Sequence, residues 1–328
     1  MRIIPRGYVC YRAEAPLDID GRLDKSVWQA APWTEDFVDI EGDLRPRPPL
    51  RTRAKMLWDD EYLYIGAELE EPHVWATLTE HDSVIYQDPD FEVFIDPDGD
   101  NHQYYEIEIN ALNTEWDLRL PKPYRDGGPA IDEWEIPGFR SAVHVDGTIN
   151  DPEDTDVGWS VEMAIPWVVL GEFAKCPCPP RPGDQWRVDF SRVEWHVEIL
   201  DGRYEKRKGI PEENWVWSPQ GVIDMHRPET WGYVQFSTAA PGSDAFCRDP
   251  AEPIRMYLMD VYHAQRAFRE ANGRWAGDMS DLAVPVCEGV TQPEMRLSEQ
   301  GYIASATFEA TSERWNVRED SLLWKEAV

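Results

Sequence analysis

Short segments of alternating apolar and polar residues recur along most of this chain. Between Tyr8 and about Ser237 they include RAKMLWD, YLYIGAELEE, FEVFIDP, YYEIEINAL, TEWDLRL, GWSVEMAIPW, WRVDFSRVEW and GYVQF. Alternation with period two is typical of strands with one buried face, and Asp-Asp, Asp-Gly and Pro-Gly pairs between the segments indicate turns. Eight or more such strands without repeated helices predict an antiparallel β-sandwich of the jelly-roll kind.

The pattern changes after about residue 240. Residues 253–272 place apolar side chains at helical spacing, and Gly273 follows as a helix end. The segment EMRLSEQGYIASATFEA then has the pattern of a hairpin. We therefore expect a β-sandwich over residues 1–240 and a small α+β module over residues 241–328. The apolar face of its helix either packs within the module, which is the favoured interpretation, or binds a protein partner.

Charge narrows the class of ligand. The 63 acidic and 32 basic residues give a formal net charge of -31, which repels phosphate backbones. Nucleic acid is therefore not expected as a partner, and neither is an anionic membrane. Thirteen of the 16 tryptophans fall within residues 1–240. Such an excess serves core packing, but carbohydrate-binding proteins also use indole rings against the C–H faces of sugars.

Cysteine usage and hydropathy leave the compartment open. The five cysteines are scattered and odd in number, so no disulfide framework is expected. No apolar run reaches the length of a membrane span, and the first residues lack the apolar stretch of a secretion signal. The sequence as given predicts a cytoplasmic protein. If residues have been removed from it, the protein is expected to be extracytoplasmic.

The densest acidic stretch is DSVIYQDPDFEVFIDPDGDNHQYYEIEIN, residues 82–110. Within it Asp96, Asp98 and Asp100 alternate around a glycine that permits a tight turn. Oxygen ligands at every second position suit Ca²⁺, although the EF-hand pattern is incomplete. A solvated hairpin turn explains the same residues. We expect structural calcium here as one of two interpretations.

Polar residues interrupt the strands that flank this turn. In YEIEIN, Glu106, Glu108 and Asn110 fall on one face of the predicted strand, and the isoleucines fall on the other. Trp116 and Arg119 continue the polar and aromatic pattern on the next strand. On a sheet face beside aromatic rings, such a row could bind sugar hydroxyls. The plainer interpretation is a solvent-exposed face.

Five ordered motifs resemble a known family. They are PLDIDGRLDKSVWQAA, AKMLWDDEYLYIGAELEEP, the 82–110 stretch, GWSVEMAIPW and WSPQGVIDMHRPETWGYVQF. In this order they resemble the family 9 carbohydrate-binding modules, and more closely the stand-alone bacterial family 9-like proteins of the DOMON superfamily. The resemblance covers about residues 8–237. It implies a β-sandwich that binds polysaccharide chain ends or oligosaccharides without catalysis, in carbohydrate catabolism, and that carries structural calcium.

The resemblance also implies a site in which two aromatic rings enclose a sugar. By position the first ring is Tyr86, six residues before Glu92, and Glu92 matches a polar contact of the family. Glu108 falls where those modules have a basic contact residue. The second ring position falls on Met225, next to His226, so this sequence departs from the family there. Trp215 is a further aromatic candidate.

Two other functions fit parts of the sequence. Paired carboxylates around Glu92 could hydrolyse glycosides, but no residue stands out as catalytic, and the sequence has no serine-hydrolase, zinc-protease or phosphate-loop motif. Some DOMON domains bind haem b through a methionine and a histidine. Met225 with His81 or His226 would be the corresponding pair here.

Overall fold

The computed structural model describes residues 3–327, which divide into two compact units. The first unit comprises residues up to 98, together with 103–120 and 130–246. The second comprises residues 247 onward, together with the short segments 99–102 and 121–129. The second unit therefore includes two segments that come from the middle of the sequence. Each unit is described separately below.

The first unit consists mainly of strands. These are β1 (Gly7–Arg12), β2 (Val38–Asp39), β3 (Thr52–Trp58), β4 (Tyr62–Glu70), β5 (Asp90–Asp96), β6 (Tyr104–Asn110), β7 (Glu115–Leu120), β8 (Arg140–Asp146), β9 (Gly158–Pro166), β10 (Gln185–Glu194), β11 (Val197–Leu200), β12 (Arg203–Lys206), β13 (Glu213–Val216) and β14 (Gly232–Ser237). Its short helices are α1 (Ser26–Ala30) and α2 (Trp167–Leu170).

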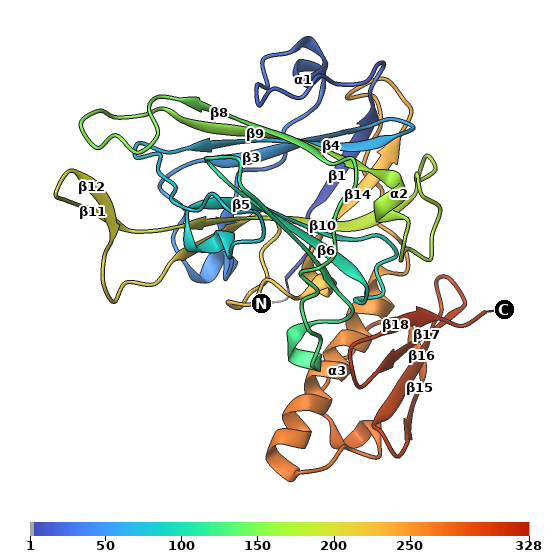
Figure 1. The fold of residues 1–328 in the computed structure, drawn as a ribbon. Coiled ribbons are helices and arrows are strands. Elements are labelled where there is room, and N and C mark those ends of the chain that lie inside the picture. Colours follow the sequence, from blue (N-terminus) through green and yellow to red (C-terminus); the bar gives the residue numbers. More distant parts are fainter. Residues whose placement is uncertain (1–2, 328) are drawn as a thin grey trace. The chain divides into compact units, whose positions relative to one another are not determined.

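Most of these strands form one curled sheet in the order β7-β6-β5-β10-β14-β1-β3-β4-β9-β8, and β13 and β2 branch from β10. In Figure 1, β3, β4, β8 and β9 form one layer of the sandwich, and β5, β6 and β10 form the other. The pairing is antiparallel except at β1, which runs parallel to both β14 and β3. The predicted antiparallel sandwich is confirmed, and β1 is the one departure from antiparallel pairing among the described strands. Strands far apart in the sequence can pair parallel because no tight turn joins them.

The core of the first unit lies between the two layers. Val93 of β5, Ile107 of β6 and Ile65 of β4 are fully buried in it. Aromatic rings fill much of the space, and burying each contributes about 2 kcal/mol of stabilisation. Within residues 3–327 the buried tryptophans are Trp28, Trp58, Trp75, Trp134, Trp159, Trp167, Trp186, Trp215, Trp217 and Trp231. Most of the tryptophan excess therefore serves packing.

A buried carboxylate fixes the loop around α1. Glu162 of β9 is 0 % exposed and accepts hydrogen bonds from Trp28 Nε1 at 2.6 Å and from two backbone N–H groups of the loop at 2.8 Å. Lys25 Nζ forms an ion pair with the same carboxylate. Every oxygen of this buried group therefore has a donor, as a buried charge requires.

The second unit packs one helix on a small sheet. Helix α3 (Glu252–Asn272) begins one residue before the predicted range and ends at Gly273 with φ +70°. It buries Leu258 and Val261 against a four-stranded antiparallel sheet, where a hairpin was predicted. The strands are β15 (Val290–Leu297), β16 (Tyr302–Phe308), β17 (Glu313–Arg318) and β18 (Leu323–Lys325). None of the helices in residues 3–327 has both the length and the apolar character that a membrane span requires.

Candidate functional site

The outer face of the layer formed by β5, β6, β7 and β10 carries polar side chains in register. We use "outer face" for the side of these strands that points away from the core. Glu92 of β5 pairs with Glu108 of β6, which pairs with Trp116 of β7. The next row toward the other end of the strands holds Phe94 beside Glu106. Successive side chains of a strand point to opposite faces of the sheet. The sequence neighbours of these residues point into the core, so these residues lie together on the outer face.

Four carboxyl groups on this face, which we call the acid row, are buried: Asp90, Glu92, Glu106 and Glu108. Their exposed fractions are 0 %, 6 %, 4 % and 2 %. Burial raises the pKa of Glu92 to about 7, and burial followed by charge repulsion within the row raises the pKa of the other three well above ordinary values. Asp90 Oδ2 and Glu106 Oε2 have no hydrogen-bond partner among the described residues. The row therefore offers unused acceptor atoms.

An aromatic edge borders the acid row. Tyr86 lies in a 3-10 turn (Ile85–Gln87), and its backbone N–H donates to Glu108 Oε2 at 2.9 Å. Its ring stacks on Trp116 at 6.5 Å and is 37 % exposed. Trp195 Nε1 donates to the backbone oxygen of Tyr86 at 2.9 Å. The turn is thus held from two sides, and one ring face is available beside the carboxylates.

Met225 and His226 lie over the other end of the same face. Met225 packs against the cluster formed by Phe94, Tyr104 and Trp231. His226 Nδ1 is 2.9 Å from the Tyr104 hydroxyl, and its ring meets Phe94 edge to face at 5.9 Å. The structure therefore places both residues near the acid row. The indole at this end, Trp231, is fully buried and so offers no ring face to match Tyr86.

Three other predicted site residues have different surroundings. Asn110 is fully buried, and its side chain bonds Leu78 O, Asp88 Oδ2 and two backbone N–H groups. Arg119 stacks over Phe173, a residue packed against the core, at 4.1 Å. Trp215 is 3 % exposed and belongs to the core. These contacts hold loops and layers together, so the three residues do not extend the row of unused acceptors.

The predicted calcium ligands divide between the two units. Asp96 ends β5 and is fully buried, and Asp98 follows it in the turn, each with a carboxylate oxygen within 4.8 Å of the other. The Lys175 backbone N–H donates to Asp98 Oδ2 at 3.0 Å. Asp100 belongs to the second unit, where its backbone oxygen accepts from Leu323 N at 3.1 Å. Calcium at this turn stays a prediction.

Sequence reasoning missed two residues of the face. Asp90 continues the alternation of Glu92 and Phe94, so extending the period by one step would have found it. Trp195 gave no such signal, because its contact with Tyr86 joins residues 109 positions apart.

A hollow of about 580 Å³ lies beside Trp195. Glu71 and Glu194 line it, and the buried Arg192 donates to both carboxylates, at 2.7 Å each. Burial, and then the Glu194 charge, raise the pKa of Glu71 to about 8. Trp215 also borders this hollow. Because of this raised pKa, Glu71 is mostly protonated at neutral pH, and the cluster gains a second negative charge only as the pH rises through about 8.

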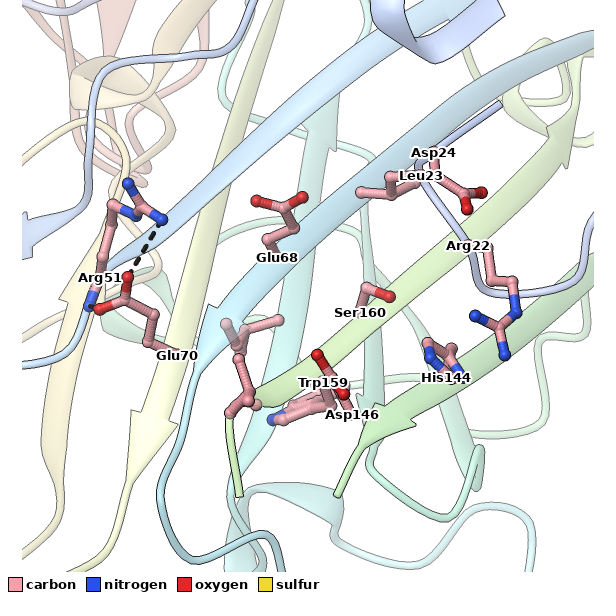
Figure 2. Close-up of a pocket in the computed structure, with 13 residues that line it drawn as sticks. Arg22, Leu23, Asp24, Arg51, Glu68, Glu70, His144, Asp146, Trp159 and Ser160 are labelled. Atoms are coloured by element: carbon pink, nitrogen blue, oxygen red, sulfur yellow. Dashed lines mark hydrogen bonds and ion pairs between the residues drawn. The ribbon is translucent and has the colours of Figure 1, made fainter. Parts of the chain in front are cut away.

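A second pocket, of about 410 Å³, lies on the opposite layer. Figure 2 shows Glu68 of β4, Ser160 of β9 and His144 of β8 around it. Arg51 and Glu70 at its rim form an ion pair at 3.0 Å. Among the described lining residues, Trp159 is the only tryptophan, tyrosine or phenylalanine, and it is 4 % exposed. The pocket therefore has polar groups but no free ring face, and it fits a sugar less well than the outer face does.

Comparisons with known proteins agree with this architecture. The chain is 28 % identical over 152 residues to exoglucanase XynX of Acetivibrio thermocellus, 46 % of this chain and 12 % of that enzyme. It is 30 % identical over 116 residues to endo-1,4-beta-xylanase A of Thermoanaerobacterium saccharolyticum, 35 % of this chain and 8 % of that enzyme. The chain thus spans about a tenth of the length of these curated relatives.

One solved structure shares the fold, and another was found at a lower score. A candidate carbohydrate-binding protein from Bacteroides uniformis superposes with a TM-score of 0.52 at 15 % identity, over 71 % of this chain and all of that one. A family 9 carbohydrate-binding module from Caldicellulosiruptor kristjanssonii in complex with cellotriose gives a TM-score of 0.46 at 15 % identity, over 74 % of this chain and all of that one. Residues 19–237 match the family described as carbohydrate family 9 binding domain-like. The match covers most of the chain, which therefore belongs to this family.

Proposed function

We propose that this protein binds carbohydrate, without catalysis, on the outer face of β5, β6 and β7. One sugar ring lies against the exposed face of Tyr86, and its hydroxyls donate to Glu92 and Glu108. Met225 and His226 contact the ligand from the other end. The observation that carries this proposal is the adjacency of an exposed ring, stacked on Trp116, to a row of buried carboxylates in which Asp90 Oδ2 and Glu106 Oε2 have no donor among the described residues. Sugars combine apolar C–H faces with hydroxyl donors and so complement both features.

The relatives suggest the class of sugar. The matched enzymes are an exoglucanase and an endo-1,4-β-xylanase, and the matched part is about a tenth of their length. A binding module attached to such an enzyme would hold the polysaccharide that the enzyme degrades. We therefore favour β-1,4-linked gluco- and xylo-oligosaccharides as ligands, in polysaccharide catabolism. A neutral ligand also suits a chain of net charge -31.

The test is calorimetric titration with cello- and xylo-oligosaccharides. Tyr86→Ala should weaken binding by about 10- to 100-fold, because a stacked ring contributes on the order of 1–3 kcal/mol beside polar contacts. Tyr124→Ala is the matched control, since Tyr124 is 45 % exposed and lies in the second unit. Equal affinity of the Tyr86 variant and the wild-type protein for every sugar would exclude this site.

Calcium at the Asp96 turn is a separate proposal. Asp96 is buried, and with Asp98 it supplies hard oxygen ligands of the kind that Ca²⁺ prefers. The ion would stabilise the turn after β5 and take no part in sugar contact. Asp98→Asn should lower the rise in melting temperature that calcium produces. If calcium raises the melting temperature of Asp98→Asn as much as that of the wild-type protein, calcium does not bind at this turn.

A further inference from the structure

The acid row contains a second, more compact group of oxygen atoms. Asp90, Glu92 and Glu108 each place one carboxylate oxygen within 4.8 Å of the other two. All three are buried, and they lie on two paired strands at the centre of the outer face. We propose that these three carboxylates bind one divalent cation, of the size and hardness of Ca²⁺, at the base of the proposed sugar site.

The charge balance of this region supports a cation. None of the four acid-row carboxylates forms an ion pair with a lysine, arginine or histidine within residues 3–327. Glu106, the fourth member of the acid row, is not one of the three proposed ligands. It is 4 % exposed, and its Oε2 has no partner among the described residues. Buried carboxylates without donors are costly, and a bound cation offsets that cost.

Two of the three ligands are held in place by the backbone. The Val193 N–H donates to Asp90 Oδ1 at 3.0 Å, so the unpartnered Oδ2 is left for a ligand. The Tyr86 N–H donates to Glu108 Oε2 at 2.9 Å. Such outer contacts orient metal ligands before the ion arrives. Glu92, at 6 %, is the most exposed of the three.

The chemistry of the three groups suits calcium. Ca²⁺ takes about 6–8 oxygen ligands at about 2.3–2.6 Å in flexible geometry, whereas Mg²⁺ demands near-ideal octahedral geometry and usually keeps several waters. A group of three protein carboxylates therefore suits the larger ion. A cation here would also present a positive charge to sugar hydroxyl oxygens. That last role rests on the proposed function, but the binding of the ion does not.

The experiment is titration of the full chain with CaCl₂ after treatment with EDTA and removal of the chelator. Calorimetry compares wild type with Glu108→Gln, which keeps the side-chain size and an oxygen acceptor for Tyr86. Glu70→Gln is the matched control, because that carboxylate is half exposed and paired with Arg51 on the other layer. Asp98→Asn separates this site from the predicted calcium turn.

We expect Glu108→Gln to bind one calcium ion fewer per chain than wild type, and Glu70→Gln to match wild type. Asp98→Asn should retain the site that Glu108→Gln loses. Asp90→Asn gives a second reading if Glu108→Gln does not fold. Unchanged stoichiometry and affinity in both acid-row variants would overturn the inference.

Sugar titration of the same samples distinguishes the two proposals. Calcium binding lost in Glu108→Gln, with no sugar bound by any sample, would support the cation site and count against the proposed function alone. Sugar binding by wild type with no calcium site in the acid row would count against the cation alone.

Discussion

Glu162 and the acid row are both buried carboxylates of the same unit, but their surroundings differ. Glu162 accepts from two backbone N–H groups and an indole, and it pairs with Lys25. Asp90 and Glu106 each leave one oxygen without any donor in the described structure. A carboxylate buried for stability is surrounded by donors. A row in which some oxygens lack donors lowers the stability of the ligand-free protein, which indicates that the row is used for a ligand.

Removing Glu162 should have the largest effect. Glu162→Ala would leave Trp28 Nε1 and two loop N–H groups without an acceptor and Lys25 without its buried partner. Breaking a buried ion pair costs about 3–5 kcal/mol, so we expect a fall of about 4 kcal/mol in the free energy of unfolding. Urea denaturation measures it. A loss below 1 kcal/mol would mean that donors around a buried carboxylate do not distinguish the two regions.

Glu71 is an intermediate case, because one guanidinium serves both Glu71 and Glu194. Its folded-state pKa is about 8, above that of the unfolded chain, so the folded protein holds a proton that the unfolded chain releases. Its contribution to stability is therefore fully present below about pH 4.5 and is lost as the pH rises through about 8.

Urea denaturation of wild type and Glu71→Gln at several pH values tests this. The difference between the two should change with pH over that window, since the substitution removes only this titration. Parallel stability profiles would show that Arg192 satisfies both carboxylates.

Glu108→Gln should have the smallest effect on stability and the opposite sign to Glu162→Ala. Without added cations, replacing a buried carboxylate that lacks a counter-charge should raise the free energy of unfolding by about 1 kcal/mol. The glutamine oxygen can still accept from the Tyr86 N–H. Thermal unfolding in EDTA measures the change. A clear loss of stability would place Glu108 with Glu162 as a structural residue.

Local alternation predicts much of this face. The period of two in YEIEIN places Glu106 and Glu108 together, and the register with β5 then brings Glu92 beside Glu108. Contacts between distant segments are not encoded in that alternation. The inward position of Trp215 depends on pairing with Arg192 of β10, and the support of Tyr86 depends on Trp195.

The division of the chain into two units also depends on contacts that the local sequence does not predict. The sequence of the turn after β5 is typical of an ordinary hairpin, but residues 99–102 belong to the second unit. There the Asn101 side chain donates to the backbone oxygen of Ser321, 220 positions later in the chain. No local pattern reveals such a partner, because it is set by tertiary packing.

The position of β1 has a consequence for synthesis. This strand pairs with β14 over five residues but with β3 over only two. A ribosome makes β1 first and β14 more than 200 residues later, so the first strand emerges long before its main partner exists. At about 5–20 residues per second that wait lasts on the order of ten seconds or more, during which β1 has free edges. The sandwich can close only near the end of translation of its own unit, and a chaperone that shields the first dozen residues would act in that interval.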